Sequence, residues 1–111
     1  MNPEKAASIY RAIWDISGMD LVDLRDEFID AAIRYARIRV DWIRAIPTER
    51  VGREQERTLA HDALIDACNI LSRALLQAGF SADWRAELGN DRKEIGDFAC
   101  YLHYRLGLDA C

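Results

Sequence analysis

Long uninterrupted runs of apolar residues are missing from this sequence of 111 residues. A helix that crosses a membrane needs about 20 consecutive, mainly apolar residues, so we expect no membrane association. A positively charged start followed by an apolar segment is also missing, and we therefore expect no signal peptide. No segment alternates polar and apolar residues for long enough to form a half-buried β-strand. These absences leave a helical, soluble protein as the expectation.

The sequence has only three cysteines, and its 15 lysines and arginines are outnumbered by 19 aspartates and glutamates. The cysteines are Cys68, Cys100 and Cys111, an odd number without the spacing of a disulfide framework. Reduced thiols in a cytoplasmic protein fit this number best. The formal net charge is −4 and the pI is about 5.1. This balance argues against non-specific binding to nucleic acid but leaves room for a local basic patch.

The composition is that of one folded helical domain. Half of the residues are hydrophobic and 31% are charged, which is typical of a globular chain rather than a disordered one. A chain of this length forms a single domain, 1–111, and buries about two-thirds of its unfolded surface without disulfides or metal. The expected fold class is all-α. The spacing of apolar residues predicts a helical bundle of four main helices (about 3–17, 20–46, 53–78 and 91–106) plus a short helix at 82–88.

Residues that favour helix ends support these boundaries. Asn2, with a proline directly after it, is a typical helix start. Asp20 is expected to cap the long second helix, and Pro47 is expected to end that helix and open the main linker, 47–52. Gly96 falls inside the last helix, where glycine costs about 1 kcal/mol relative to alanine. We therefore expect another part of the chain to pack closely against Gly96.

The stretch 20–46 is the segment around which the rest of the chain is organised. Apolar residues recur in it at alternating steps of three and four, and a second apolar row runs alongside the first. Together the rows cover more of the helix circumference than one neighbouring helix can bury. The stretch is also roughly 40 Å long, which exceeds what a domain of this size requires. We therefore predict a homodimer whose interface includes Phe28, Tyr35, Ile38, Arg39 and Trp42.

Arg39 interrupts the apolar side of this helix near its centre. One interpretation is that its aliphatic stem lies on the core while the guanidinium group reaches water. The other is a buried Arg39 that pairs with a carboxylate from another helix or stacks on Trp42, one turn further along.

The sequence offers few groups for metal binding or catalysis. His61 and Cys68 are seven residues apart, and Cys100 and His103 are three apart, but these spacings match no established zinc pattern. Neither cysteine lies at an expected helix N-terminus, where its thiol would become more acidic. No activated nucleophile with a partnering base stands out. We therefore predict no metal, no cofactor and no enzymatic activity.

The stretch 81–104 has the rhythm of a helix–turn–helix, with Gly89 placed as the turn glycine and Ile95 as the anchor of the second helix. However, Arg85 stands where a small residue is usual, and Arg92 stands where an apolar one is usual. The second helix also opens with mixed charges, whereas contacts with phosphates need a net positive surface. DNA binding through this stretch is therefore the alternative function and not the first.

Several polar and aromatic segments follow one another between residues 57 and 108: Arg57, His61, Asn69-Ile70-Leu71-Ser72-Arg73, Trp84-Arg85, Leu88-Gly89, Asp91-Arg92 and Ile95-Gly96-Asp97-Phe98-Ala99-Cys100-Tyr101-Leu102. By these segments, about half of the chain resembles a family of small uncharacterised bacterial helical proteins, a domain of unknown function. The resemblance implies a bacterial or phage cytoplasmic protein and brings no activity with it. It singles out a candidate polar site: Arg57, His61, Asn69, Ser72, Trp84, Arg92 and Asp97.

We predict that Arg57 and His61 face the last helix and pair there with Asp97 or with neighbours of Arg92. The alternative interpretation is a structural polar network that fixes the packing of the helices. As to function, we predict a non-catalytic protein-interaction or regulatory module that acts as a homodimer, with another protein as a further partner.

Overall fold

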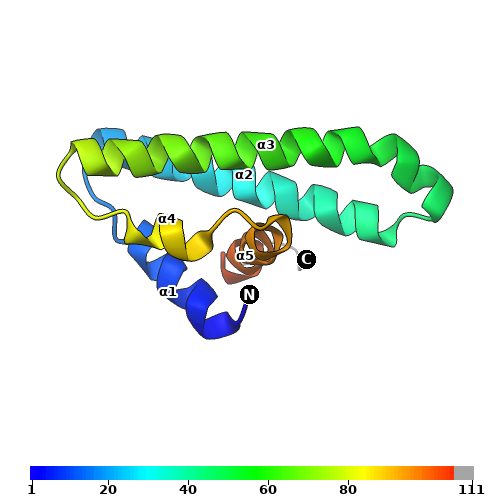
Figure 1. Ribbon diagram of the computed structural model, residues 1–111, viewed down its shortest axis with the longest axis horizontal. Helices are drawn as coiled ribbons and strands as arrows, with labels where there is room; N and C mark the ends of the chain where they lie inside the picture. The colour runs from blue at the N-terminus through cyan, green and yellow to red at the C-terminus, as the bar shows by residue number, and fades with distance from the viewer. Residues whose placement is uncertain (107–111) are drawn as a thin grey trace.

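The computed structural model describes residues 1–106 and folds them into five helices (Figure 1). These are α1 (Pro3–Trp14), α2 (Met19–Arg44), α3 (Pro47–Gln77), α4 (Asp83–Leu88) and α5 (Arg92–Arg105). No β-strand occurs among these described residues, which confirms the predicted all-α class. None of the five helices is long and apolar enough to cross a membrane. Cys111 lies outside the described residues.

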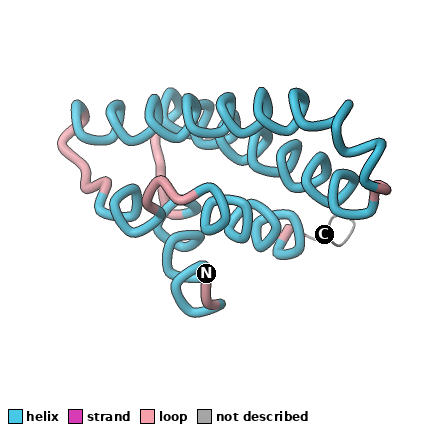
Figure 2. Tube along the Cα trace, turned by 45° about the vertical axis from the view of Figure 1, so that its right-hand side comes forward, coloured by secondary structure: helices cyan, strands magenta, loops and turns pink. Residues whose placement is uncertain are grey.

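An antiparallel hairpin of α2 and α3 forms the frame of the molecule and runs along its longest dimension of 48 Å. The three shorter helices pack on one side of this hairpin, and α5 is seen almost end-on in Figure 1, so it crosses the hairpin at a steep angle. Figure 2 shows the same division into a hairpin layer and a layer of short helices. The predicted arrangement of four main helices as one bundle is therefore not confirmed.

The core lies where α2 meets the short helices. Phe28 of α2 is 1% exposed, and its ring stacks on Trp84 of α4 and on Phe98 of α5 at centroid distances of 5.9 and 6.5 Å. Aromatic pairs at such distances attract each other beyond the effect of the area that they bury. Further fully buried side chains come from α1, α2, α3 and α5: Ile9, Ile13, Tyr35, Leu64, Leu71, Ile95 and Leu102.

The connection between α2 and α3 differs from the predicted one. Pro47 is the first residue of α3 and does not open a linker, so the segment 47–52 is helical. Proline is tolerated in the first turn of a helix, because the N–H group that it lacks would have no intrahelical acceptor there. The side chain of Arg50 then satisfies the carbonyl groups that end α2. Its guanidinium group donates to three of them, including that of Ile43 at 2.7 Å.

Of the two residues predicted to cap the first two helices, one is confirmed and the other is not. Asn2 caps α1 as predicted and accepts a hydrogen bond from the Lys5 backbone N–H at 2.8 Å. Asp20 does not cap α2, because that helix begins at Met19, directly after Gly18 with its φ of +103°. Glycine adopts such a conformation more readily than residues with a side chain. Asp20 instead lies in the first turn, where the helix dipole favours its negative charge.

Candidate functional site

A cleft of about 340 Å³ opens between α2, α3 and α5, near the end of the hairpin where α2 and α3 connect. Its walls come from three helices: Tyr35, Arg39, Trp42 and Ile43 of α2, Arg57 of α3, and Arg92 and Lys93 of α5. In α2, Tyr35 and Arg39 are four positions apart, and Trp42 and Ile43 follow Arg39 by three and four, which places all of them along one side of that helix. Four of the seven side chains are cationic although the chain as a whole is acidic. We call this site the basic cleft.

Two guanidinium groups of the basic cleft converge on one carboxylate oxygen. The Nη2 atoms of Arg57 and Arg92 lie 3.9 and 3.8 Å from the same Oε1 atom of Glu54. Hydrogen bonds between a guanidinium and a carboxylate are typically about 2.7–2.9 Å long, so neither distance is a bond of that kind. Arg92 also donates to the Thr58 hydroxyl at 3.4 Å. Glu54 therefore forms no short bond with either guanidinium group.

Trp42 forms the aromatic wall of the cleft. The guanidinium carbon of Arg57 lies 4.1 Å from the centre of the indole ring, and that of Arg50 lies 4.7 Å from it. Cations in this position are attracted by the negative face of the ring. The Nε atoms of Arg57 and Arg92 and the indole nitrogen of Trp42 are buried without a hydrogen-bond acceptor. The walls of the cleft thus hold more donors than acceptors, which is the composition that an anion complements.

Arg39 is anchored at the inner side of the cleft by a carboxylate. Its Nη1 atom lies 3.0 Å from Oδ1 of Asp97 on α5, and its side chain is 20% exposed. Pairing of a largely buried Arg39 with a carboxylate from another helix is therefore the interpretation that is confirmed. The other oxygen of Asp97 accepts from the Met1 amino group at 2.9 Å and lies 3.5 Å from the Lys93 ammonium group.

Gly96 lets α5 approach this ion pair. A methyl group in place of its hydrogen would lie 2.8 Å from Nη1 of Arg39 and 3.2 Å from a ring carbon of Tyr35. Both distances are shorter than ordinary van der Waals contacts between heavy atoms. The close packing predicted at Gly96 is therefore confirmed, and it explains why a residue with low helix propensity stands inside α5.

We expect Asp97→Asn to lower the free energy of unfolding at neutral pH by roughly 1.5–3 kcal/mol, the range for hydrogen bonds to charged groups. Burial by itself would raise the pKa of Asp97, but hydrogen bonds from the Met1 amino group and from Arg39 outweigh it and hold the pKa below its usual value. The stabilisation is therefore complete above the unfolded-state pKa of about 3.9 and is lost as the pH falls through the folded-state pKa.

Denaturant unfolding of the wild type and of Asp97→Asn between about pH 2 and pH 7 measures this effect. The difference in unfolding free energy should shrink as the pH falls. A difference that keeps its neutral-pH value in acid would contradict the role given to the Asp97 carboxylate.

His61 lies beside the basic cleft and does not form the predicted pair with Asp97. Its ring meets Tyr35 edge to face at a centroid distance of 5.7 Å, and its Nδ1 atom lies 3.7 Å from the carboxylate of Asp62 on its own helix. Burial and the neighbouring Arg92 guanidinium lower the pKa of His61, so the imidazole is neutral at pH 7. Of the predicted partners, Asp97 is not found, because its carboxylate pairs with Arg39, but Arg57 does meet Arg92 of the last helix at the carboxylate of Glu54.

The other members of the predicted polar site lie away from the cleft and join α4 to α3. The amide oxygen of Asn69 accepts from Nε of Arg85 at 3.0 Å, and the same guanidinium group donates to the carbonyl oxygen of Gly89 at 2.6 Å. Ser72 donates to the backbone carbonyl of Asn69, and Trp84 is buried against Phe28. Of these three residues, only Asn69 links α4 to α3 by a hydrogen bond, because Ser72 bonds within its own helix and the indole nitrogen of Trp84 has no hydrogen-bond partner among the described residues.

Several residues at the basic cleft were not predicted from the sequence to belong to a site. Glu54 and Lys93 were not selected, and Trp42 was assigned to a dimer interface. A usable signal is present for Glu54, since it precedes Arg57 by three residues and both fall on one side of α3. No local pattern predicts that Arg92 and Lys93 come to the same place, because α5 reaches it only through the tertiary fold.

Two residues of the predicted dimer interface lie in the chain's own core. Phe28 is 1% and Tyr35 is 2% exposed, so the folded chain itself covers them and they are not available to a second copy. This corrects the predicted interface at those two positions. Ile38, Arg39 and Trp42 are partly exposed.

The position of α5 does not suit a DNA-reading helix. Of its residues only Lys93, Tyr104 and Arg105 are exposed, whereas the reading helix of a helix–turn–helix contacts base edges with several side chains near its N-terminus. The side that begins with Arg92 and includes Gly96 is turned toward α2 and α3. The helix–turn–helix rhythm of 81–104 therefore reflects packing of α4 and α5 into the core.

The buried thiol of Cys68 is a poor nucleophile. Burial raises its pKa to about 11, against an opposing effect of the Arg85 guanidinium. The group is therefore protonated at neutral pH, and a thiol is much less nucleophilic than a thiolate. Among residues 1–106, no cluster of three or more histidine, cysteine, aspartate or glutamate side chains is placed to hold a metal ion.

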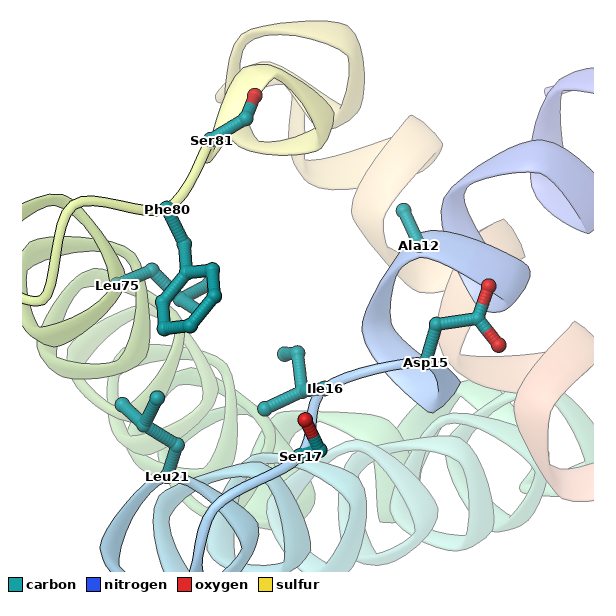
Figure 3. A pocket seen from close by; sticks show the side chains of 8 residues that line it. All are labelled: Ala12, Asp15, Ile16, Ser17, Leu21, Leu75, Phe80 and Ser81. Carbon is teal, nitrogen blue, oxygen red and sulfur yellow. The ribbon is translucent and has the colours of Figure 1, made fainter.

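A second hollow, of about 170 Å³, lies at the opposite end of the hairpin (Figure 3). The side chains of Ile16 and Phe80 face the space between them, whereas Asp15 and Ser81 turn their oxygen atoms away from it. Phe80 is placed there by the end of α3, where its backbone N–H donates to the carbonyl of Leu75 at 2.9 Å, a usual way to end a helix. Ser17 turns its hydroxyl oxygen toward this hollow, but no charged side chain of the lining does, so we regard the basic cleft as the candidate site.

Comparison of the chain with protein-family models, with curated proteins and with solved structures gives no significant match. The resemblance to a bacterial helical family is therefore not tested by these comparisons and stays a prediction.

Proposed function

We propose that the protein is a non-catalytic binding module that recognises an anionic group of its partner through the basic cleft. The observation that carries this proposal is the convergence of the Arg57 and Arg92 guanidinium groups, from two different helices, on a single carboxylate oxygen at 3.9 and 3.8 Å. Guanidinium forks are well suited to bind carboxylate and phosphate oxygens in pairs. An anion seated between these two groups would form shorter bonds than Glu54 does.

The balance of charge in the cleft supports an anionic ligand. The lining carries four cations, Arg39, Arg57, Arg92 and Lys93. The carboxylates in contact with them are Asp97 and Glu54. The cleft thus keeps an excess of two positive charges, and its partly enclosed position reduces the screening that weakens charge interactions at an open surface.

The same groups support binding rather than catalysis. Arginine stays protonated at physiological pH, so the guanidinium groups of the cleft do not exchange protons with a bound molecule. The nearest histidine, His61, has a lowered pKa, with burial as the main cause, and no carboxylate of the cleft is arranged as its partner. General acid–base catalysis needs such a pair within hydrogen-bond reach of the reacting atoms.

Isothermal titration calorimetry at low ionic strength, with inorganic phosphate as the probe, tests the proposal. We expect saturable binding of one phosphate per chain, which weakens as salt is added because the contact is ionic. The absence of saturable binding by the wild type would refute the proposed function.

We also propose that two copies of the chain associate through the connection between α2 and α3. The feature that supports this is a group of exposed apolar side chains there: Ile43, Ile46 and Val51 are 52, 59 and 81% exposed. Neighbouring exposed aliphatic residues of this kind mark interaction surfaces. Native mass spectrometry should find a dimer for the wild type and for the control Ile70→Glu, and a monomer for Val51→Glu. A monomeric wild type would contradict this proposal.

A further inference from the structure

We propose that the basic cleft takes a phosphate group of a small phosphorylated molecule, and that Glu54 is an internal competitor which this phosphate displaces. The proposal rests on the proposed function of the cleft and names the class of ligand and the regulation of the same site. The carboxylate of Glu54 already lies near the guanidinium groups of both Arg57 and Arg92.

Glu54 is placed to occupy the cleft reversibly. One oxygen of its carboxylate lies between the Nη2 atoms of Arg57 and Arg92, yet 3.9 and 3.8 Å from them. Its side chain is 47% exposed, so the carboxylate can rotate into solvent without crossing a packed region. Among the described residues, no hydrogen bond holds this side chain, and these two ion pairs are its contacts with charged groups. Glu54 thus partly neutralises the arginines while it remains free to leave.

A tethered carboxylate sets a requirement for any ligand that replaces it. Glu54 precedes Arg57 by three residues in the same helix, so its effective concentration at the cleft is about millimolar or higher. A free carboxylate offers the same charge and the same two oxygens, and it has no advantage over a group that is already present. A ligand therefore needs more charge or more oxygen atoms than a carboxylate has.

A phosphate monoester meets this requirement. It carries a charge of about −1.5 to −2 at neutral pH and three terminal oxygen atoms. Its charge matches the excess of two positive charges that remains when Glu54 and Asp97 are counted. When Glu54 leaves, the attraction to the ligand increases further. A phosphodiester of nucleic acid carries only one negative charge per phosphate, so it lacks the second charge that gives the monoester its advantage.

The size of the cleft agrees with a small molecule. Its volume of about 340 Å³ lies at the lower end of the range of about 300–1,000 Å³ that is usual for small-molecule sites. Trp42 and the aliphatic side chain of Ile43 provide an apolar wall beside the cationic groups. This wall suits the organic part of a phosphate monoester, while Arg57, Arg92 and Lys93 bind its phosphate.

Calorimetric titration of the wild type and of Glu54→Gln tests the proposal, with inorganic phosphate and acetate as the probes. Glutamine keeps the size of Glu54 and removes its charge. We expect the wild type to bind phosphate more tightly than acetate, and Glu54→Gln to bind phosphate about two- to fivefold more tightly than the wild type, as removal of one competing ion pair predicts. Glu56→Gln, at an exposed position of the same helix, is the matched control and should bind like the wild type.

The outcomes separate this proposal from the proposed function. If the wild type binds phosphate and Glu54→Gln binds it equally or more weakly, Glu54 is not a competitor, although the cleft still binds anions. If the wild type binds acetate as tightly as phosphate, the inferred ligand class is wrong. If neither protein binds either probe, the proposed function itself fails. Circular dichroism of both variants shows whether they keep the wild-type fold.

Discussion

Replacement of Phe28 by alanine is expected to lower the free energy of unfolding by about 3–5 kcal/mol, the usual cost of removing a buried phenylalanine side chain. Phe28 is 1% exposed, and its ring is the shared contact of Trp84 on α4 and Phe98 on α5. The substitution would leave a cavity at the point where α2, α4 and α5 meet. Urea denaturation followed by far-ultraviolet circular dichroism measures the change.

Phe80→Ala is the matched control for this experiment. Phe80 has the same side chain, but it is 53% exposed and lies at the end of α3, so its removal should cost about 1 kcal/mol or less. If the two variants lose the same stability, or if Phe28→Ala loses less than about 1 kcal/mol, Phe28 does not join the three helices as the structure indicates.

Replacement of Arg57 by alanine is expected to weaken phosphate binding by about tenfold or more. A hydrogen bond to a charged group contributes about 1.5–3 kcal/mol, and 1.4 kcal/mol corresponds to a factor of ten in affinity. Arg92→Ala should have an effect of the same size, because its guanidinium group faces the same oxygen of Glu54 from the other wall. Calorimetric titration with inorganic phosphate at low ionic strength measures both losses.

Two further variants give this prediction its controls. Arg73→Ala removes an exposed arginine of the same helix, away from the cleft, and should bind phosphate like the wild type. Arg57→Lys keeps the positive charge but loses the paired donors of the guanidinium fork, and we expect an intermediate loss. If Arg57→Ala and Arg73→Ala weaken binding equally, the effect comes from total charge and the cleft is not a specific site.

Much of the fold follows from patterns that are local in the sequence. The apolar spacing of α2 and the glycine in α5 predicted a central helix and a close approach at Gly96, and both are found. Local patterns do not predict a helix boundary where one residue is compatible with both a helix end and a helix start. Pro47 was interpreted as the end of a helix, yet proline is equally compatible with the first turn of the next one. In the structure Pro47 begins α3, and the side chain of Arg50 in the first turns of α3 caps the C-terminal end of α2.

The candidate site was predictable only in part, because its residues meet through tertiary structure. The polar residues of α3 were identified, but the sequence does not indicate that Arg57 and Asn69 belong to different surroundings, one at the basic cleft and one at the contact with α4. The pairing of Arg39 with Asp97 was foreseen as a type of contact and not as a specific pair. Which carboxylate Arg39 takes depends on the steep crossing of α5 over the hairpin, and no periodic pattern encodes that angle.

The central claim is that an anion binds in the basic cleft beside Trp42. The three tryptophans allow one measurement to test it, because Trp84 is buried in the core and Trp14 lies at the end of α1, whereas only Trp42 lines the cleft. Titration of the wild type with inorganic phosphate, followed by the indole N–H signals in a proton–nitrogen correlation spectrum, reports on all three at once. We predict a saturable shift of the Trp42 signal, assigned with Trp42→Phe, while the other two stay in place. If the Trp42 signal does not move, or if all three move together without saturation, the account of the cleft is contradicted.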